Sequence, residues 1–482
     1  LKYRYFLHLS SLKYRYFLCI FRLKYRYIEM GEAMIFKRKA YEELKKWKEK
    51  YGKNYAAFLE GPRRVGKSTI AEEFAKNEFK SYIKIDFANV KQSTLDIFND
   101  IADLNRFFLR LQLETGVTLY EGESVIIFDE IQKAPLVRQA IKYLVLDGRY
   151  YFIETGSLIS IRQNVKDIVI PSEEYKIPVY PMDYEEFLSA TGNTSYSVLR
   201  KLYSQNAPIG ECTHRKLMRD FRLYMAVGGM PQAVDCYVQN KNFEEIDMVK
   251  RRIIDLYEED FKKIDSTGRI SRLFDSIPSQ LMAGKKRFVI SNTLKKKTTS
   301  KDEELLSDML DSKTVIISYN TTEVNLSLNL NRTLDSYKLY LADTGLFVTM
   351  LFKDEGGVYK DIYKKLLSDK LDINLGYLFE NMVAQMIASS GRNLFYHTWR
   401  KENSTHQYEV DFLIIKNGKI SPIEVKSSSV RYHSSITEFA KKYSSQVNEQ
   451  YLISQKDVGK EGMLKLKPIY LLPFILETSL SS

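Results

Sequence analysis

The most specific chemical signature in the chain is GPRRVGKST, at residues 61–69. It has the form G-x-x-x-x-G-K-[ST], in which two glycines let backbone N–H groups turn toward phosphate oxygens. We expect Lys67 to reach the β and γ phosphates of ATP, Ser68 to ligate Mg²⁺, and Thr69 to add a phosphate contact. The residues of this loop predicted to bind ATP are Gly61, Pro62, Arg63, Arg64, Val65, Gly66, Lys67, Ser68 and Thr69.

A pair of acids follows 62 residues after Lys67, where the β-branched run SVIIFD ends in Asp129 and Glu130. In nucleotide hydrolases a carboxylate so placed holds Mg²⁺, and a second one polarises the attacking water. We therefore predict Asp129 as a metal ligand and Glu130 as the general base, with Lys67 also contributing to catalysis. The alternative is that the two acids cap the next helix.

A further apolar run, RYYFIETGSL, ends in Thr155 and Ser157. A polar side chain at this point could sense the γ phosphate, and we predict Ser157 in that role. A simple turn residue is the alternative.

Five runs rich in β-branched and aromatic residues are expected to position these side chains as strands. Helical patterns separate them, and the order strand, glycine-rich loop, helix is the one that the phosphate motif requires. We predict a three-layer α/β domain with a parallel sheet over residues 34–195. The expected strands are residues 54–60, 81–90, 124–129, 149–158 and 174–187.

A second group of chemically capable residues lies in YEVDFLIIKNGKISPIEVKSSS, residues 408–429. Glu409 and Asp411 would share one face of a first strand, because side chains alternate along a strand. Glu424 and Lys426 would share a face of the strand that follows the Asn-Gly turn. An ordinary surface hairpin with ion pairs is the alternative.

The spacing of Asp411, Glu424 and Lys426 resembles the pattern of PD-(D/E)XK nucleases. Asp411 and Glu424 could hold Mg²⁺ against a scissile phosphate, and Lys426 could orient the water. Glu380, on an expected helix, could complete the metal site. We therefore predict a restriction-endonuclease-like α/β domain at residues 351–482, with cleavage left open.

The middle of the chain reads as helical. A helix broken at Gly228-Gly229 and an amphipathic helix over residues 243–264 fill the predicted helical region, residues 196–265. The charges of the second helix favour a solvated face. Residues 266–350 alternate helices with two strands, which predicts a winged-helix-like module, and the basic TLKKKTTSK at 293–301 could contact DNA.

The segments GPRRVGKST, IIFDEIQKAP, ETGSL, YPMDYEEFL and YMAVGGMPQAV together resemble prokaryotic AAA-type ATPases that carry a C-terminal domain of unknown function. These are similar to the archaeal-ATPase and STAND branches of P-loop proteins, and the resemblance covers roughly residues 34–470. Many relatives have a Gly-Arg pair before the segment matching YPMDYEEF, which is absent here. The arginine that would neutralise the γ phosphate is left open between a neighbouring subunit, Arg63, Arg64, Arg149 and Arg162.

The first 33 residues repeat LKYRY with a period of 11. We predict that this segment arose from an over-extended reading frame with a true start at Met34, and a basic aromatic arm is the alternative. Residues 1–29 supply +6 of the net charge of +12, so the charge permits a nucleic-acid partner without requiring one.

Three scattered cysteines, Cys19, Cys212 and Cys236, indicate a reducing cytoplasm and no disulfide framework. No apolar run approaches the roughly 20 residues of a membrane span, so no membrane partner is expected. The run IYLLPFIL at 469–476 is expected to be a buried strand.

Three functions are consistent with these observations. The first is a Mg-dependent ATPase that acts as a nucleotide-driven switch, with a C-terminal module that binds DNA or a protein and with homo-oligomers allowed. The second is an ATP-regulated, metal-dependent DNA or RNA nuclease. The third is a nucleotide-binding interaction protein that does not hydrolyse ATP.

Overall fold

The computed structural model describes residues 34–157, 169–295, 299–352, 359–368, 376–402, 404–427 and 433–477. The described residues from Lys37 onward form one compact unit. The repeat at residues 1–33, Arg162 and part of the basic segment 293–301 lie outside the described residues. Within the described ranges, no helix is both long and apolar enough to cross a membrane.

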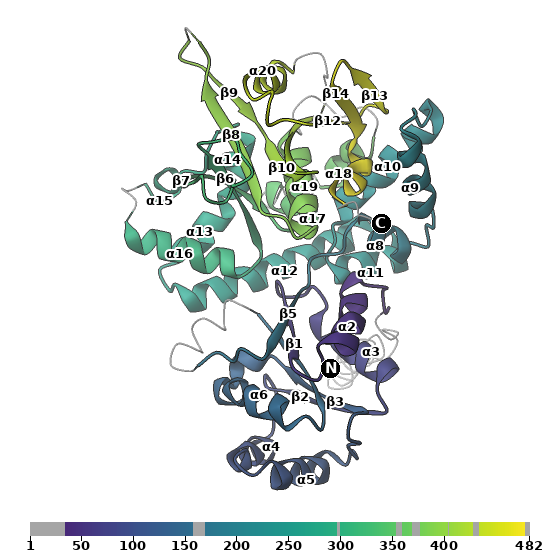
Figure 1. Ribbon diagram of the computed structural model, residues 1–482, viewed down its shortest axis with the longest axis vertical. Helices are drawn as coiled ribbons and strands as arrows, with labels where there is room; N and C mark the ends of the chain where they lie inside the picture. Colours follow the sequence, from purple (N-terminus) through teal and green to yellow (C-terminus); the bar gives the residue numbers. More distant parts are fainter. Residues whose placement is uncertain are drawn as a thin grey trace, which may run out of the picture. The chain divides into compact units, whose positions relative to one another are not determined.

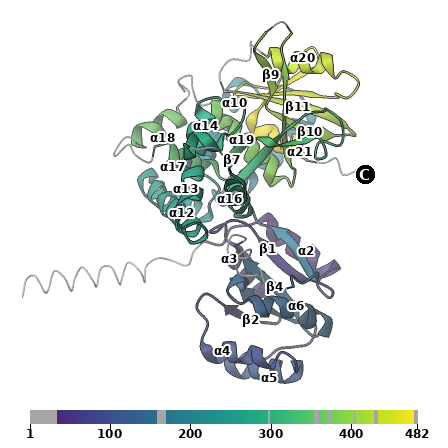
Figure 2. The same cartoon turned by 90° about the vertical axis from the view of Figure 1, so that its left-hand side faces the viewer.

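A five-stranded parallel sheet forms the core of the first domain, as predicted (Figure 1; Figure 2 labels β4). Its strand order is β2-β3-β4-β1-β5, and all neighbours pair in parallel. The strands are β1 (Ala56–Glu60), β2 (Ser81–Asp86), β3 (Ser124–Asp129), β4 (Tyr151–Gly156) and β5 (Glu174–Pro178).

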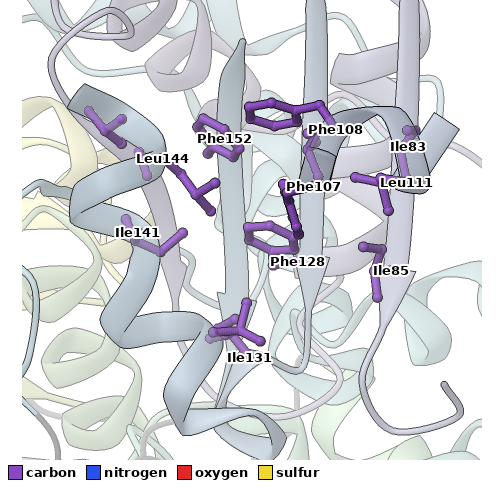
Figure 3. Close-up of a cluster of buried hydrophobic side chains, with 14 of the residues drawn as sticks. Ile83, Ile85, Phe107, Phe108, Leu111, Phe128, Ile131, Ile141, Leu144 and Phe152 are labelled. Carbon is purple, nitrogen blue, oxygen red and sulfur yellow. The ribbon is translucent and has the colours of Figure 1, made fainter. Parts of the chain in front are cut away.

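One face of this sheet is covered by a large apolar cluster (Figure 3). Phe107, Phe108 and Leu111 of α5 pack there together with Ile141 and Leu144 of α6. The central strands β1, β3 and β4 are buried on both faces, which explains their continuous apolar runs, whereas the edge strands β2 and β5 are partly exposed. The elements on or beside this face are α4 (Gln92–Ile97), η1 (Phe98–Asp100), α5 (Leu104–Thr115), η2 (Ile131–Lys133) and α6 (Pro135–Asp147).

The other face is covered by α2 (Lys39–Lys50) and α3 (Lys67–Glu78). Trp47 of α2 is fully buried and its ring lies 6.5 Å from that of Phe74 of α3. Helices on both faces make the predicted three-layer α/β arrangement, and α3 begins directly after the glycine-rich loop.

The fifth strand is shorter than predicted. It ends at Pro178, and α8 (Tyr184–Ala190) occupies the end of the segment expected to be extended. Asp183 caps this helix: it accepts the N–H of Glu186, whose side chain accepts the N–H of Asp183. A capping box of this kind overrides the strand-like pattern.

The helical region follows the prediction closely. The amphipathic helix has the predicted bounds, and the break falls at Gly228, whose φ of 87° favours glycine. The helices are α9 (Tyr196–Gln205), α10 (Glu211–Val227), α11 (Pro231–Asn240) and α12 (Phe243–Ile264).

Helices followed by an antiparallel strand pair make up the next segment, in the expected order. The pair is not a separate wing, because β6 also pairs in parallel with β8 and the sheet order is β7-β6-β8-β9. The winged-helix class therefore stays a prediction. The elements are α13 (Arg269–Asp275), α14 (Ile277–Met282), α15 (Ile290–Leu294), α16 (Ser300–Asp311), β6 (Val315–Thr321) and β7 (Arg332–Leu341).

The C-terminal part contains a second five-stranded sheet, of mixed direction, in the order β10-β11-β12-β14-β13. The α/β character is as predicted, and the restriction-endonuclease class stays a prediction. Its helices are α17 (Thr344–Leu351), α18 (Tyr359–Leu367), α19 (Gly376–Ser389), α20 (Ser434–Lys442), η3 (Ile469–Leu471) and α21 (Leu472–Leu476). Its strands are β8 (Leu394–Arg400), β9 (Gln407–Val410), β10 (Phe412–Lys416), β11 (Lys419–Lys426), β12 (Gln450–Ser454), β13 (Gly459–Glu461) and β14 (Leu464–Pro468).

Two expectations for this part are corrected. The strand predicted around Asp411 is interrupted at that residue: β9 pairs with β8 in one sheet, and β10 pairs with β11 in the other. The segment 469–476 is buried as expected but helical rather than extended. Pro473 lies in the first turn of α21, where its missing N–H costs nothing.

Candidate functional site

The glycine-rich loop has the geometry of a phosphate cradle. Gly66 has a φ of 91° and immediately precedes Lys67, the first residue of α3. The Lys67 Nζ donates to the carbonyl oxygens of Gly61 and Pro62, at 2.9 Å each. Burial lowers the pKa of Lys67 to about 8. A phosphate group would replace these carbonyls as partners and favour the charged lysine.

Asp129 and Ser68 come together at the carboxyl edge of the sheet. The Ser68 hydroxyl donates to Asp129 Oδ1 at 2.6 Å, and Lys84 Nζ lies 3.5 Å from Asp129 Oδ2. One hydroxyl and one carboxylate oxygen beside a phosphate loop fit Mg²⁺, which retains several waters and takes few protein ligands. Ser68 and Asp129 are the residues that would hold the ion.

Glu130 lies next to this pair in a left-handed conformation, with a φ of 56°. Its backbone N–H donates to the Thr155 hydroxyl at 3.4 Å, and its carboxylate contacts the Gln132 amide. Its side chain makes no hydrogen bond that caps η2, so nothing in the structure favours the helix-cap alternative. Glu130 and Asp129 therefore share one neighbour, the Thr155 hydroxyl.

The polar residue of β4 that contacts the Asp129 carboxylate is Thr155. Its hydroxyl donates to Asp129 Oδ1, while Ser157 is half-buried just after the strand. The role of Ser157 as a γ-phosphate sensor stays a prediction.

Arg38 braces the loop and was missed by the sequence analysis. Its Nη1 donates to the Val65 carbonyl at 2.8 Å and its Nη2 to the Tyr180 carbonyl at 2.7 Å. Its Nε lies 3.2 Å from Glu186 Oε1, in a buried ion pair. No sequence motif includes Arg38. The only sequence feature connected with it is its ion-pair partner Glu186, which belongs to the capping box of α8.

The arginines considered for contact with the γ phosphate have different surroundings. Arg63 pairs with Asp260 of α12 at 3.0 Å, and the Tyr257 hydroxyl donates to the Arg63 carbonyl at 2.9 Å. Arg149 donates to Asp147 at 2.7 Å. Arg64 is exposed with a φ of 71°. Which arginine approaches the γ phosphate stays open, whereas the contact between the loop and α12 is established.

The VGGMP segment joins the first domain to the C-terminal part. The Met182 N–H donates to the Gly229 carbonyl at 2.6 Å, and the Gly229 N–H donates to Asp343 Oδ2 at 2.5 Å. Lys250 of α12 is fully buried beside it and donates to the Ala226 carbonyl at 2.8 Å and the Tyr363 hydroxyl at 2.7 Å. The expectation of a solvated charged face on α12 is therefore corrected at Lys250.

In the C-terminal part, the acidic residues surround a lysine that the sequence analysis did not single out. Lys338 of β7 lies 2.8 Å from Glu380 Oε1 and 2.6 Å from Glu409 Oε1. The Tyr340 hydroxyl donates to the same Glu380 oxygen at 2.6 Å. These charges hold the pKa of Lys338 well above its usual value despite its burial.

The other predicted residues of this site have different partners. Asp411 Oδ2 accepts the Val425 N–H at 2.8 Å, and Glu424 Oε1 pairs with Lys426 at 2.8 Å. Burial, followed by the charges of Glu424 and Glu380, raises the pKa of Asp411 well above its usual value.

The structure does not assemble the predicted metal group of Glu380, Asp411 and Glu424. Among the described residues, no three or more His, Cys, Asp or Glu side chains are arranged to hold a metal ion. One physical reason is that the Lys338 ammonium group already pairs with Glu380 Oε1, while Glu424 Oε1 pairs with Lys426. The catalytic roles of Asp411, Glu424 and Lys426 stay predictions.

Comparison with protein families separates the chain into three matched segments. Residues 53–188 match the AAA domain family. Residues 218–356 match one domain of unknown function (DUF8612), and residues 375–471 match another (DUF4143). The parallel sheet, the phosphate loop and the family match together define an AAA-type ATPase domain of the P-loop class.

Solved structures similar to the chain are distant. The RuvB Holliday junction branch migration motor of Thermotoga maritima is 12% identical over 63% of this chain and 92% of its own, with a TM-score of 0.27. A STAND protein with a tetratricopeptide repeat sensor from Pyrococcus horikoshii is 12% identical over 73% of this chain and 48% of its own, with a TM-score of 0.26. No curated protein matches the sequence.

Proposed function

We propose that the protein is a Mg-dependent ATPase whose nucleotide state is communicated to its C-terminal part. The observation that carries the proposal is the meeting of Lys67, Ser68 and Asp129 around one phosphate cradle, with Ser68 Oγ 2.6 Å from Asp129 Oδ1. Glu130 would accept a proton from the attacking water, and the phosphate charge would be held by Lys67, by backbone N–H groups and by the first turn of α3. Bound Mg²⁺ would supply charge neutralisation of the phosphates.

The direct contact between the phosphate loop and α12 supports the switch. Arg63, within the loop, is held by Asp260 and Tyr257 near one end of α12. Nearer its other end, α12 carries Asp247, which accepts the Thr349 hydroxyl of α17 at 2.8 Å. A change in the loop on ATP binding would therefore bear on a helix that also packs against the C-terminal part (Figure 2). ATP can cause such a change only if it binds one conformation of the loop more tightly than the other.

No observation favours nucleic-acid cleavage over binding, so the C-terminal part is proposed as a binding module for DNA or a protein. Whether it forms homo-oligomers is left to measurement.

Replacing Lys67 with alanine is expected to weaken ATP binding about 10- to 100-fold, because one charged hydrogen-bonding group to the phosphates is lost. Isothermal titration calorimetry with Mg-ATP measures this change. The matched control is Lys76→Ala on the same helix, where the side chain is exposed and pairs with Glu72 at 3.1 Å. Equal affinity of the two variants and the wild type would refute a phosphate role for Lys67.

Replacing Asp260 with alanine is expected to reduce the nucleotide-dependent change in hydrogen exchange of α12, because it removes the ion pair between the Arg63 side chain and the helix. Exchange is compared with and without a non-hydrolysable ATP analogue. Since the ion pair is partly exposed, we expect ATP affinity to change by less than about fivefold. Asp255→Ala, exposed on the same helix, is the control. An unchanged exchange response in Asp260→Ala would argue against coupling through this contact.

A further inference from the structure

Four acidic residues lie on neighbouring elements of the C-terminal part, and Lys338 of β7 joins two of them, Glu380 and Glu409. The four are Glu380 of α19, Glu409 of β9, Asp411 between β9 and β10, and Glu424 of β11, and we call them the carboxylate cluster. Two lysines, Lys338 and Lys426, lie among them. The cluster therefore has four acidic groups and only two basic groups at its centre.

Lys338 has the environment of a bound cation. Its side chain is only 5% exposed, and its ammonium touches oxygens of two carboxylates, at 2.8 and 2.6 Å. Its Nζ also lies 5.5 Å from the centre of the Tyr396 ring, whose face favours a positive charge. Oxygen atoms from separate carboxylates are also the ligands that Mg²⁺ or Mn²⁺ prefers.

Glu424 provides an independent sign that the cluster is suited to a larger cationic charge. The residue is 4% exposed, and although its Oε1 pairs with Lys426, its Oε2 is buried without any hydrogen-bond partner in the described part of the chain. A buried carboxylate oxygen without a partner is costly and marks a place where a donor or ion would be stabilised.

We propose that Lys338 is a built-in cation that holds Glu380 and Glu409 where the nuclease-like pattern would require a divalent metal ion, so that the carboxylate cluster does not fit a metal in the wild type. A divalent ion cannot share the oxygens of Glu380 and Glu409 with an ammonium group, because the two positive charges would repel each other at contact distance. This inference concerns the C-terminal part alone and does not depend on ATP hydrolysis.

The test measures Mn²⁺ binding by electron paramagnetic resonance in nucleotide-free, full-length protein. Every variant carries Asp129→Asn, which removes the predicted metal ligand of the ATP site. Lys338→Ala is expected to bind Mn²⁺ at least about tenfold more tightly than its Asp129→Asn parent, a difference of 1.4 kcal/mol. Lys338→Arg retains the positive charge and is expected to resemble the parent.

The tighter Mn²⁺ binding of Lys338→Ala must come from the carboxylate cluster. Adding Glu424→Gln to Lys338→Ala is therefore expected to abolish the new binding. Circular dichroism shows whether each variant folds, since Lys338→Ala leaves carboxylates without their cation. If Lys338→Ala does not fold with or without Mn²⁺, the same measurement is made on Lys338→Ala/Glu380→Gln, in which one negative charge is removed as well.

Two results would overturn the proposal. One is a folded Lys338→Ala or Lys338→Ala/Glu380→Gln variant that binds no more Mn²⁺ than the parent. The other is Mn²⁺ binding by the parent that Glu424→Gln abolishes, because the cluster would then be an open metal site.

Discussion

Replacing Glu130 with glutamine is expected to lower the rate of ATP hydrolysis about 10²- to 10⁴-fold, the usual contribution of a general base. Glutamine has the same size but cannot accept the proton of the attacking water. ATP binding is expected to remain intact, because Lys67 and the loop N–H groups, rather than Glu130, face the phosphates. Steady-state phosphate release gives the rate, and calorimetry with the ATP complex gives the affinity.

The control for this variant is Glu121→Gln, an exposed acid three residues before β3. If Glu130→Gln hydrolyses ATP at the wild-type rate, the base lies elsewhere. If the wild type binds ATP but releases no phosphate under any condition, the protein is the non-hydrolysing nucleotide binder considered above. The two outcomes are distinct. The first would show that Glu130 is not the general base, and the second would show that the protein is not an ATPase.

Glu130 and Asp129 differ in surroundings although they are adjacent in sequence. Asp129 is buried and engaged by Ser68, Thr155 and Lys84. Glu130 has a left-handed backbone, its carboxylate accepts a hydrogen bond from the Gln132 amide, and its N–H donates to Thr155. The carboxylates of these adjacent acids thus have different hydrogen-bond partners.

Replacing Gly229 with alanine is expected to destabilise the protein by about 3 kcal/mol or more. A Cβ at Gly229 would lie 2.2 Å from the Met182 carbonyl oxygen and 2.7 Å from the Met182 nitrogen. Both atoms belong to the backbone of a buried segment, so the clash cannot be relieved by turning a side chain. Urea denaturation followed by circular dichroism measures the shift in the unfolding midpoint.

The matched control is Gly376→Ala at the start of α19, where a Cβ would meet only the Ser427 hydroxyl, at 3.6 Å. We expect a change of less than about 1 kcal/mol there, because alanine is a good helix former and fits the space. Equal unfolding midpoints for Gly229→Ala and Gly376→Ala would show that the contact between Met182 and Gly229 is not required for the stability of the fold.

The features that could be predicted from the sequence are those determined by residues close together in the chain. The order of strand, loop and helix around Lys67 follows from a motif of nine residues and from continuous apolar runs, and the structure reproduces it. The bounds of α12 were also read correctly, because its apolar positions recur with the period of a helix. Residues 469–476 were misread, since a short apolar run fits a strand and a buried helix equally well.

The roles of Arg38, Lys250 and Lys338 could not be predicted from the sequence. Each is a basic residue in a segment with many others, and nothing local separates a buried lysine from a solvated one. Lys338 is 42 residues from Glu380 and 71 from Glu409 along the chain, so only folding brings them within 2.8 and 2.6 Å. The break at Asp411 likewise arises because neighbouring strands belong to two different sheets.

The sequence by itself determined the phosphate chemistry of this protein, because the groups that bind a phosphate are mostly the backbone of one short loop. Only the tertiary structure decided the character of the C-terminal acids, because a carboxylate's behaviour depends on which charge lies beside it. There the neighbouring charge is Lys338, which comes from a strand that no motif connected to the site. Two of these acids, Glu380 and Glu409, pair with Lys338 in the folded protein.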